Sequence, residues 1–180
     1  MTKQDHIKRS AIIARTEWFK DHAKQDTSDP NLVIWRKEGT SNYYMRYRLD
    51  GQYLIITGDA GDAIYAWSQM LTWEWLADLE LNYFVSKCCA SEEGRPYVQW
   101  SHRVTAAWLD TWKKEHPKFA DKLDETYSLG NREEFQHFLA ANPHFDFEDA
   151  DVGEVLHVRA IGHWVGIQMM FAGKRLEHYK

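Results

Sequence analysis

The sequence of 180 residues predicts a single α+β domain over residues 1–180. The domain is a small antiparallel meander of three to four strands, packed by an N-terminal helix and several C-terminal helices. Two observations lead to this fold class. Apolar side chains recur with a helical period near the N-terminus and through much of the second half. Between residues 32 and 67 they instead alternate or form short β-branched and aromatic runs, which is typical of strands.

The first helix is expected over residues 3–24, with Thr2 as its N-cap. One apolar stripe runs along it, formed by Ile7, Ala11, Ala14 and Trp18. Turn-forming residues and a proline at residues 26–30 are expected to end the helix.

Strands are then expected at four places, which are residues 32–37, 43–49, 53–57 and 63–67. Alternation in the second strand puts Tyr43, Met45, Tyr47 and Leu49 on one face and Tyr44, Arg46 and Arg48 on the other. The Asp50-Gly51 pair after it is a strong hairpin signal.

The remaining elements are expected to be mostly helical: residues 71–79, 83–90, a helix capped by Ser101, one from Pro117 to Gly130, one capped by Asn131 and Glu134, and a last one over 154–175. Residues 97–100 could add a short strand. In the last helix, Gly162 and Gly166 lie one turn apart and would let another element approach closely.

The formal net charge of −5, from 22 basic and 27 acidic side chains, argues against broad nucleic-acid binding, which needs a basic field. It fits a partner with a basic surface. Aromatic residues make up 14% of the chain, so they could fill a core or anchor an interface.

Cysteine usage indicates a reducing compartment such as the cytoplasm, because Cys88 and Cys89 are adjacent and unsuited to a disulfide. They could be buried small hydrophobic residues or a vicinal pair that binds a soft metal. The polar N-terminus predicts no secretory leader, and the longest apolar stretch, residues 160–172, is too short to span a bilayer.

The turn Gly58-Asp59-Ala60-Gly61-Asp62 is the most distinctive local motif. Its glycines and its carboxylates Asp59 and Asp62 could hold an anion or a hard cation. It lacks the lysine of a P-loop and the third glycine of a dinucleotide fingerprint, so a structural turn whose aspartates bind local amides is the favoured interpretation. We expect no cofactor and no metal.

Three further features each have a functional interpretation and a simpler structural one. Glu154 and His157 have the spacing of two ligands on one helical face, but a di-metal bundle needs two such pairs. His163, on an apolar segment, is expected to be a hydrogen-bonded core histidine. Arg46 and Arg48, with Tyr44 and Arg36, could present a cationic, aromatic surface suited to phosphate or a stacked base, or simply a solvated sheet face.

An acidic run before the last helix is either a docking surface for a basic partner or a solvated loop. Its members are Asp146, Glu148, Asp149 and Asp151.

The strand and turn over residues 43–65, with the pattern Thr57-Gly58-Asp59-Ala60-Gly61, resemble a group of uncharacterised phage and prophage proteins. The element Asn82-Tyr83-Phe84 with Lys87, and the segment from Ala160 to Gln168 with its Ala-Ile-x-x-Trp pattern, resemble the same group. Residues 101–151 match nothing in it.

The resemblance implies a mobile-element gene, whose product is expected in the cytoplasm of a bacterial host cell. Small acidic phage proteins are often stoichiometric inhibitors of bacterial defence, such as anti-CRISPR proteins. We therefore expect a binding protein rather than an enzyme, with a host protein as partner. The alternative is a small nucleotide- or metal-binding enzyme that uses the turn at residues 58–62.

Overall fold

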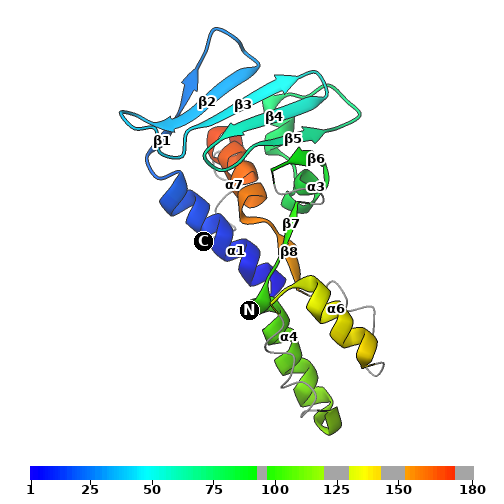
Figure 1. Ribbon diagram of the computed structural model, residues 1–180. Coiled ribbons are helices and arrows are strands. Elements are labelled where there is room, and N and C mark those ends of the chain that lie inside the picture. The colour runs from blue at the N-terminus through cyan, green and yellow to red at the C-terminus, as the bar shows by residue number, and fades with distance from the viewer. Residues whose placement is uncertain (93–96, 120–129, 143–152, 173–180) are drawn as a thin grey trace. The chain divides into compact units, whose positions relative to one another are not determined.

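The structure is a computed structural model that describes residues 1–92, 97–119, 130–142 and 153–172 (Figure 1). The chain divides into two compact units, which we describe separately. The sheet unit comprises residues 7–98 and 156–180, and the helical unit comprises residues 1–6 and 99–155.

An antiparallel sheet of six strands forms the centre of the sheet unit. Its strands are β1 (His22–Asp26), β2 (Leu32–Lys37), β3 (Met45–Asp50), β4 (Tyr53–Gly58), β5 (Ala63–Ala66) and β6 (Cys88–Ser91). Each strand pairs with the next one in the sequence, so the sheet is a meander. The α+β class and the meander are confirmed, with two more strands than the upper expected number.

Both additional strands replace predicted helix. The first helix, α1 (Lys3–Ile13), continues as the π-helix η1 (Ala14–Trp18), and β1 begins at His22. The chain reverses direction at Asp21, which has a positive φ of 63°. Strand β6 occupies the second half of the helix expected over residues 83–90. Both strands lie at the edges of the sheet, where pairing with one neighbour can outweigh a weak local preference.

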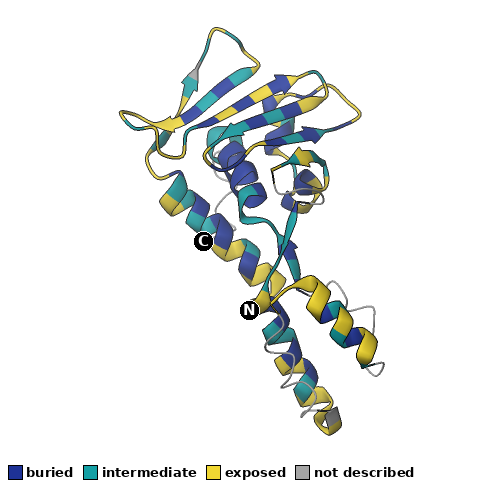
Figure 2. Cartoon of the chain, in the orientation of Figure 1, coloured by how far each residue is buried: buried dark blue, intermediate teal, exposed yellow. Residues whose placement is uncertain are grey.

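Helices cover one face of the sheet. They are α2 (Trp73–Ala77), α3 (Leu81–Ser86), α7 (Val158–Ile167) and, after α7, the π-helix η5 (Gln168–Ala172). Figure 1 shows α3 and α7 below the sheet. Alternate residues of β3, namely Met45, Tyr47 and Leu49, are buried in the same core as Ile161 and Val165 of α7. Figure 2 shows the resulting alternation of buried and exposed positions along the strands.

The two glycines of α7 do allow close approaches, as predicted. A Cβ at Gly162 would lie 2.6 Å from the Trp18 ring, and one at Gly166 would collide with the Tyr47 hydroxyl. The expected final helix over residues 154–175 is wrong at its start, because residues 154–156 form strand β8.

The helical unit contains α4 (His102–Glu115), the 3-10 turn η2 (Pro117–Phe119) and α6 (Arg132–Ala141). The short strands β7 (Val98–Trp100) and β8 (Glu154–Leu156) pair with each other. All three predicted N-caps are present: Thr2 Oγ1 accepts from Asp5 N, the Ser101 hydroxyl accepts from Val104 N, and Asn131 Oδ1 accepts from Glu134 N. The remainder of the helix predicted from Pro117 onward lies outside the described residues.

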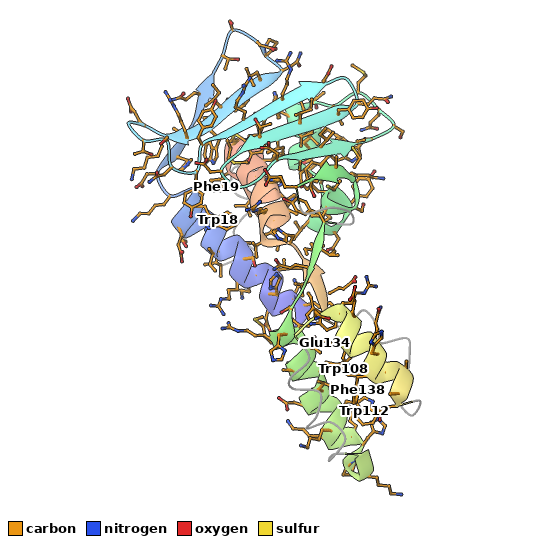
Figure 3. All side chains as sticks on the ribbon, in the orientation of Figure 1. Trp18, Phe19, Trp108, Trp112, Glu134 and Phe138 are labelled. Carbon is orange, nitrogen blue, oxygen red and sulfur yellow. The ribbon has the colours of Figure 1, made fainter. Side chains whose placement is uncertain are left out.

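Aromatic and aliphatic side chains from α4 and α6 form the core of the helical unit. Leu109, Trp112, Phe135 and Leu139 are buried there, with Trp108 packed against them. Figure 3 labels Trp108, Trp112 and Phe138 on these two helices. In the part of the chain that the structure describes, no helix has both the length and the apolar character needed to cross a bilayer.

Candidate partner-binding surface

The face of the sheet opposite the helices carries the predicted arginine pair. In the register of the strands, Arg46 lies between Ile34 and Thr57. Arg48 lies between Leu32 and Ile55. Each arginine is therefore flanked across the strands by at least one aliphatic side chain, and the two arginines share one face, as the alternation in β3 predicted.

Neighbouring strands extend this surface. We call it the open sheet face and define it by Leu32, Ile34, Arg36, Arg46, Arg48, Tyr53, Ile55, Thr57 and Ile64. The three arginines and Tyr53 are exposed, whereas the aliphatic members are half-buried. The face thus combines cationic heads with accessible apolar area, which differs from a uniformly polar, solvated sheet face.

Few of the charges on the open sheet face are neutralised at short range. The side chain of Arg48 is 50% exposed and lies 3.6 Å from Asp29 Oδ2, a surface pair of little energetic weight. Asp50, at the end of β3, is the next exposed acid along the same face. No ion pair of Arg36 or Arg46 occurs among the described residues.

The Gly58–Asp62 turn uses its carboxylates for its own backbone. Asp59 Oδ2 accepts from Tyr44 N at 3.0 Å, and Asp62 Oδ1 accepts from Gly58 N at 3.0 Å. Gly58 and Gly61 have positive φ values of 139° and 90°, which other residues adopt only with strain. The turn therefore has the features of a structural reversal.

A buried histidine fastens this turn to α7. His163 Nε2 lies 3.0 Å from the Ala60 carbonyl oxygen and 2.9 Å from that of Gly61, and Nδ1 lies 3.0 Å from the Tyr65 hydroxyl. Burial lowers the pKa of His163 to about 4, although the hydrogen bonds to the two carbonyls oppose the shift. The ring is therefore neutral near pH 7, and the prediction of a hydrogen-bonded core histidine is confirmed.

Glu154 and His157 do not share a helical face. Glu154 lies in β8, where its carboxylate pairs with Arg132 Nη1 at 2.7 Å. His157 is the N-cap of α7, and its Nδ1 accepts from Arg159 N at 3.2 Å. Within the described ranges, no group of three or more histidine, cysteine or carboxylate side chains is placed to hold a metal ion.

The adjacent cysteines belong to the edge strand β6. Neither forms a disulfide and both are half-buried, and Cys88 packs against the core of the sheet unit. The Cys88 thiol lies 3.5 Å from the Ala90 carbonyl oxygen, within its own strand.

The acidic side chains gather in the helical unit. The predicted docking residues Asp146, Glu148, Asp149 and Asp151 lie outside the described residues, so the structure does not place them. By sequence, the helical unit has seven basic and 13 acidic side chains, a net charge of −6, whereas the sheet unit has 15 basic and 14 acidic ones. The overall negative charge is thus a property of one unit.

Two groups of surface residues were not predicted from the sequence. The contributions of Tyr53, Ile55 and Ile64 to the open sheet face were not recognised, although continuing the alternation of β3 through its hairpin to β4 would have revealed the first two. The basic residues Arg15 and Lys20 near the start of β1 were also missed, because a continuous helix was expected there.

Neither a protein-family model nor a curated protein nor a solved structure matches this chain.

Proposed function

We propose that this chain is a stoichiometric binding protein, encoded by a phage or prophage, that inhibits a protein of a bacterial defence system. The open sheet face is the observation that carries the proposal. It is a broad, regular surface on which Arg46 and Arg48 stand among accessible aliphatic side chains. Arginine and tyrosine are the side chains that most often anchor protein interfaces.

The chemistry of this face favours a protein over a nucleic acid as partner. Single-stranded nucleic acids bind sheets through several stacking rings within a basic field. Tyr53, which is 49% exposed, is the aromatic member of the open sheet face, and its other uncharged members are aliphatic side chains and Thr57. The net charge of −5 also opposes a phosphate backbone.

The acidic helical unit indicates which kind of protein is bound. With a net charge of −6 by sequence, this unit attracts a host protein that has a basic surface, such as one that itself binds nucleic acid. Long-range attraction accelerates the encounter, and short-range contacts at the open sheet face supply affinity. Binding should therefore weaken as salt concentration rises.

The geometry gives no comparable support to an enzyme centred on the turn at residues 58–62. The carboxylates of Asp59 and Asp62 are already bound to backbone N–H groups. The resemblance of this turn to a phage protein group supports the inhibitor proposal instead.

The test uses charge reversal on the open sheet face. Tagged full-length chain, and the variant Arg46→Glu/Arg48→Glu, are incubated with lysate of a bacterium that carries a defence system. Proteins retained only by the unchanged chain are purified and mixed with it, and the stoichiometry is measured by light scattering. We expect a 1:1 complex that the double variant weakens by about 100-fold or more, since two interface arginines are replaced.

The matched control is Arg9→Glu, an exposed arginine on α1 outside the open sheet face. It should bind the partner normally, and it should still restore phage plaques on the defended host. If the double variant binds and restores plaques as well as the unchanged chain does, the assignment of this face is wrong. If the unchanged chain restores no plaques against any defence system, the inhibitor proposal fails.

A further inference from the structure

A basic pocket lies where the first helical segment turns into the sheet. Its volume is about 410 Å³, within the range of small-molecule sites. Arg15 and Thr16 come from η1, His22 from β1 and Met169 from η5, with Lys20 and Phe19 between the first two elements. All of these residues belong to the sheet unit.

The lining has an excess of positive charge. Arg15 is half-buried and Lys20 is exposed, and neither forms a salt bridge in the described parts of the chain, although the charge of Lys20 helps to lower the pKa of Asp21. Asp21 is the acid of the lining, and its carboxylate accepts a hydrogen bond from Lys37 Nζ at 3.0 Å. That bond lowers the pKa of Asp21, so the carboxylate is ionised and locally neutralised by Lys37.

Apolar side chains also contribute to the lining. Phe19 is fully buried beneath the pocket, and Met169 is half-buried beside it. The His22 ring is held in place by two contacts. Its Nε2 lies 3.1 Å from the Tyr43 carbonyl oxygen, and its ring centroid lies 5.6 Å from that of Phe19 in an edge-to-face arrangement. The cationic heads together with the half-buried Met169 thioether suit an anion that carries an apolar group.

The backbone around the pocket is unusual in two ways. Both π-helices of the described chain, η1 and η5, contribute to its lining. Single-turn π-helices are rare and are frequently found at functional sites. Asp21 adds a non-glycine residue with φ of 63°, a conformation that proteins retain where the surroundings enforce it.

We propose that this pocket binds a phosphomonoester that carries an organic ring, with Arg15 and Lys20 on the phosphate and Met169 against the ring. Arginine and lysine are the usual phosphate ligands of proteins. Two sources supply this chemistry: a free mononucleotide and the 5′-phosphate end of a single-stranded nucleic acid. The pocket does not involve the open sheet face, so this inference stands or falls separately from the proposed function.

The test is isothermal titration calorimetry of the full chain with adenosine 5′-monophosphate, with a 5′-phosphorylated dinucleotide, and with inorganic phosphate. We expect saturable 1:1 binding of the first two, and binding of phosphate that is weaker by at least about tenfold, because the ring contacts are missing. The tighter of the two organic ligands identifies the source.

Variants assign the binding to the pocket. Arg15→Gln and Lys20→Gln should each raise the dissociation constant by about tenfold or more, the effect of losing one charge-assisted hydrogen bond. Arg9→Gln removes the same charge from an exposed position outside the lining and should change it by less than about twofold. The melting temperature of each variant without ligand shows that it remains folded.

Three results would overturn the inference. The first is no saturable heat with either organic ligand at about 10 mM, a concentration that fills even a millimolar site. The second is equal affinity for inorganic phosphate and the nucleotide, which removes the ring from the proposal. The third is an equal loss in Arg9→Gln, which means that binding follows overall charge rather than this pocket.

Discussion

Tyr65 donates its hydroxyl hydrogen to Nδ1 of His163 across 3.0 Å in the core of the sheet unit. The direction follows from the other ring nitrogen, because Nε2 faces the carbonyl oxygens of Ala60 and Gly61, which only accept. Nε2 therefore carries the hydrogen, and Nδ1 is the acceptor. One neutral imidazole thus connects β5, α7 and the turn at residues 58–62.

Stability should fall in mild acid because of this ring. The pKa of His163 is about 4 in the folded chain and about 6.5 when unfolded, so the unfolded state binds more protons between these values. The contribution is fully present above pH 6.5 and is lost as the pH falls toward 4. We expect it to cost about 2–3 kcal/mol between pH 7 and pH 4.5, measured by urea unfolding.

The variant His163→Gln separates this effect from the titration of carboxylates. It removes the titrating ring and leaves the acidic side chains in place. The difference in free energy of unfolding between the unchanged chain and this variant should shrink as the pH is lowered. A difference that stays constant from pH 7 to pH 4.5 would contradict the assignment.

The Tyr65 hydroxyl should be important for stability. In Tyr65→Phe, the Nδ1 acceptor of His163 is left buried without its donor, and we expect a loss of about 1–3 kcal/mol in the free energy of unfolding. Tyr53→Phe is the control, because Tyr53 is 49% exposed on the open sheet face. It should change stability by less than about 0.5 kcal/mol.

The Tyr47 hydroxyl should behave in the opposite way. It is fully buried and has no hydrogen-bond partner among the described residues, and burial raises its pKa far above the ordinary value. Replacing Tyr47 with Phe removes this unsatisfied group, so stability should stay the same or rise by about 1 kcal/mol. A clear loss of stability would reveal a partner for the hydroxyl.

Gly166→Ala should be destabilising, because its new methyl group would collide with the same hydroxyl. We expect a cost of about 1–3 kcal/mol, typical of overpacking in a core. Combining it with Tyr47→Phe removes the atom nearest to the methyl group, so the double variant should regain part of the loss. Strict additivity of the two changes would show that the collision is relieved in some other way.

Replacing Asp62 tests whether the turn at residues 58–62 is only structural. Asp62→Ala loses the acceptor for Gly58 N and should cost about 1 kcal/mol, whereas Asp62→Asn keeps an oxygen there and should cost less. Magnesium, calcium and manganese ions should leave the melting temperature of the unchanged chain within about 1 °C. A larger rise that Asp62→Asn abolishes would restore the turn as a cation site.

The alternation of polarity along β3 predicted the two faces of that strand but not the position of Tyr43. The separation of Met45, Tyr47 and Leu49 from Arg46 and Arg48 follows from the two-residue period of a strand, and the structure confirms it. Tyr43 breaks the prediction. It lies before β3 with φ of 52°, and its ring stacks on that of Trp18 with 5.9 Å between the centroids. Its position is therefore set by contact with the helix that ends at Trp18 and not by strand pairing.

Elements without a sequence pattern could not be predicted. Strand β1 reads His-Ala-Lys-Gln-Asp and β6 reads Cys-Cys-Ala-Ser, and neither alternates in polarity. Both exist because an existing strand offers its edge to them. The basic pocket depends on the same event, since Lys20 and His22 meet Met169 only once the helix has ended and β1 has formed.

The sequence by itself determined the α+β class, the order of the central strands, the capped helices and the arginine face, because each depends on residues close together in the chain. The tertiary structure decided the edge strands, the burial of His163 against Tyr65, the separation of Glu154 from His157 and the pocket at Arg15. These features join segments up to 154 residues apart, as with Arg15 and Met169, and only the packed fold brings such segments together.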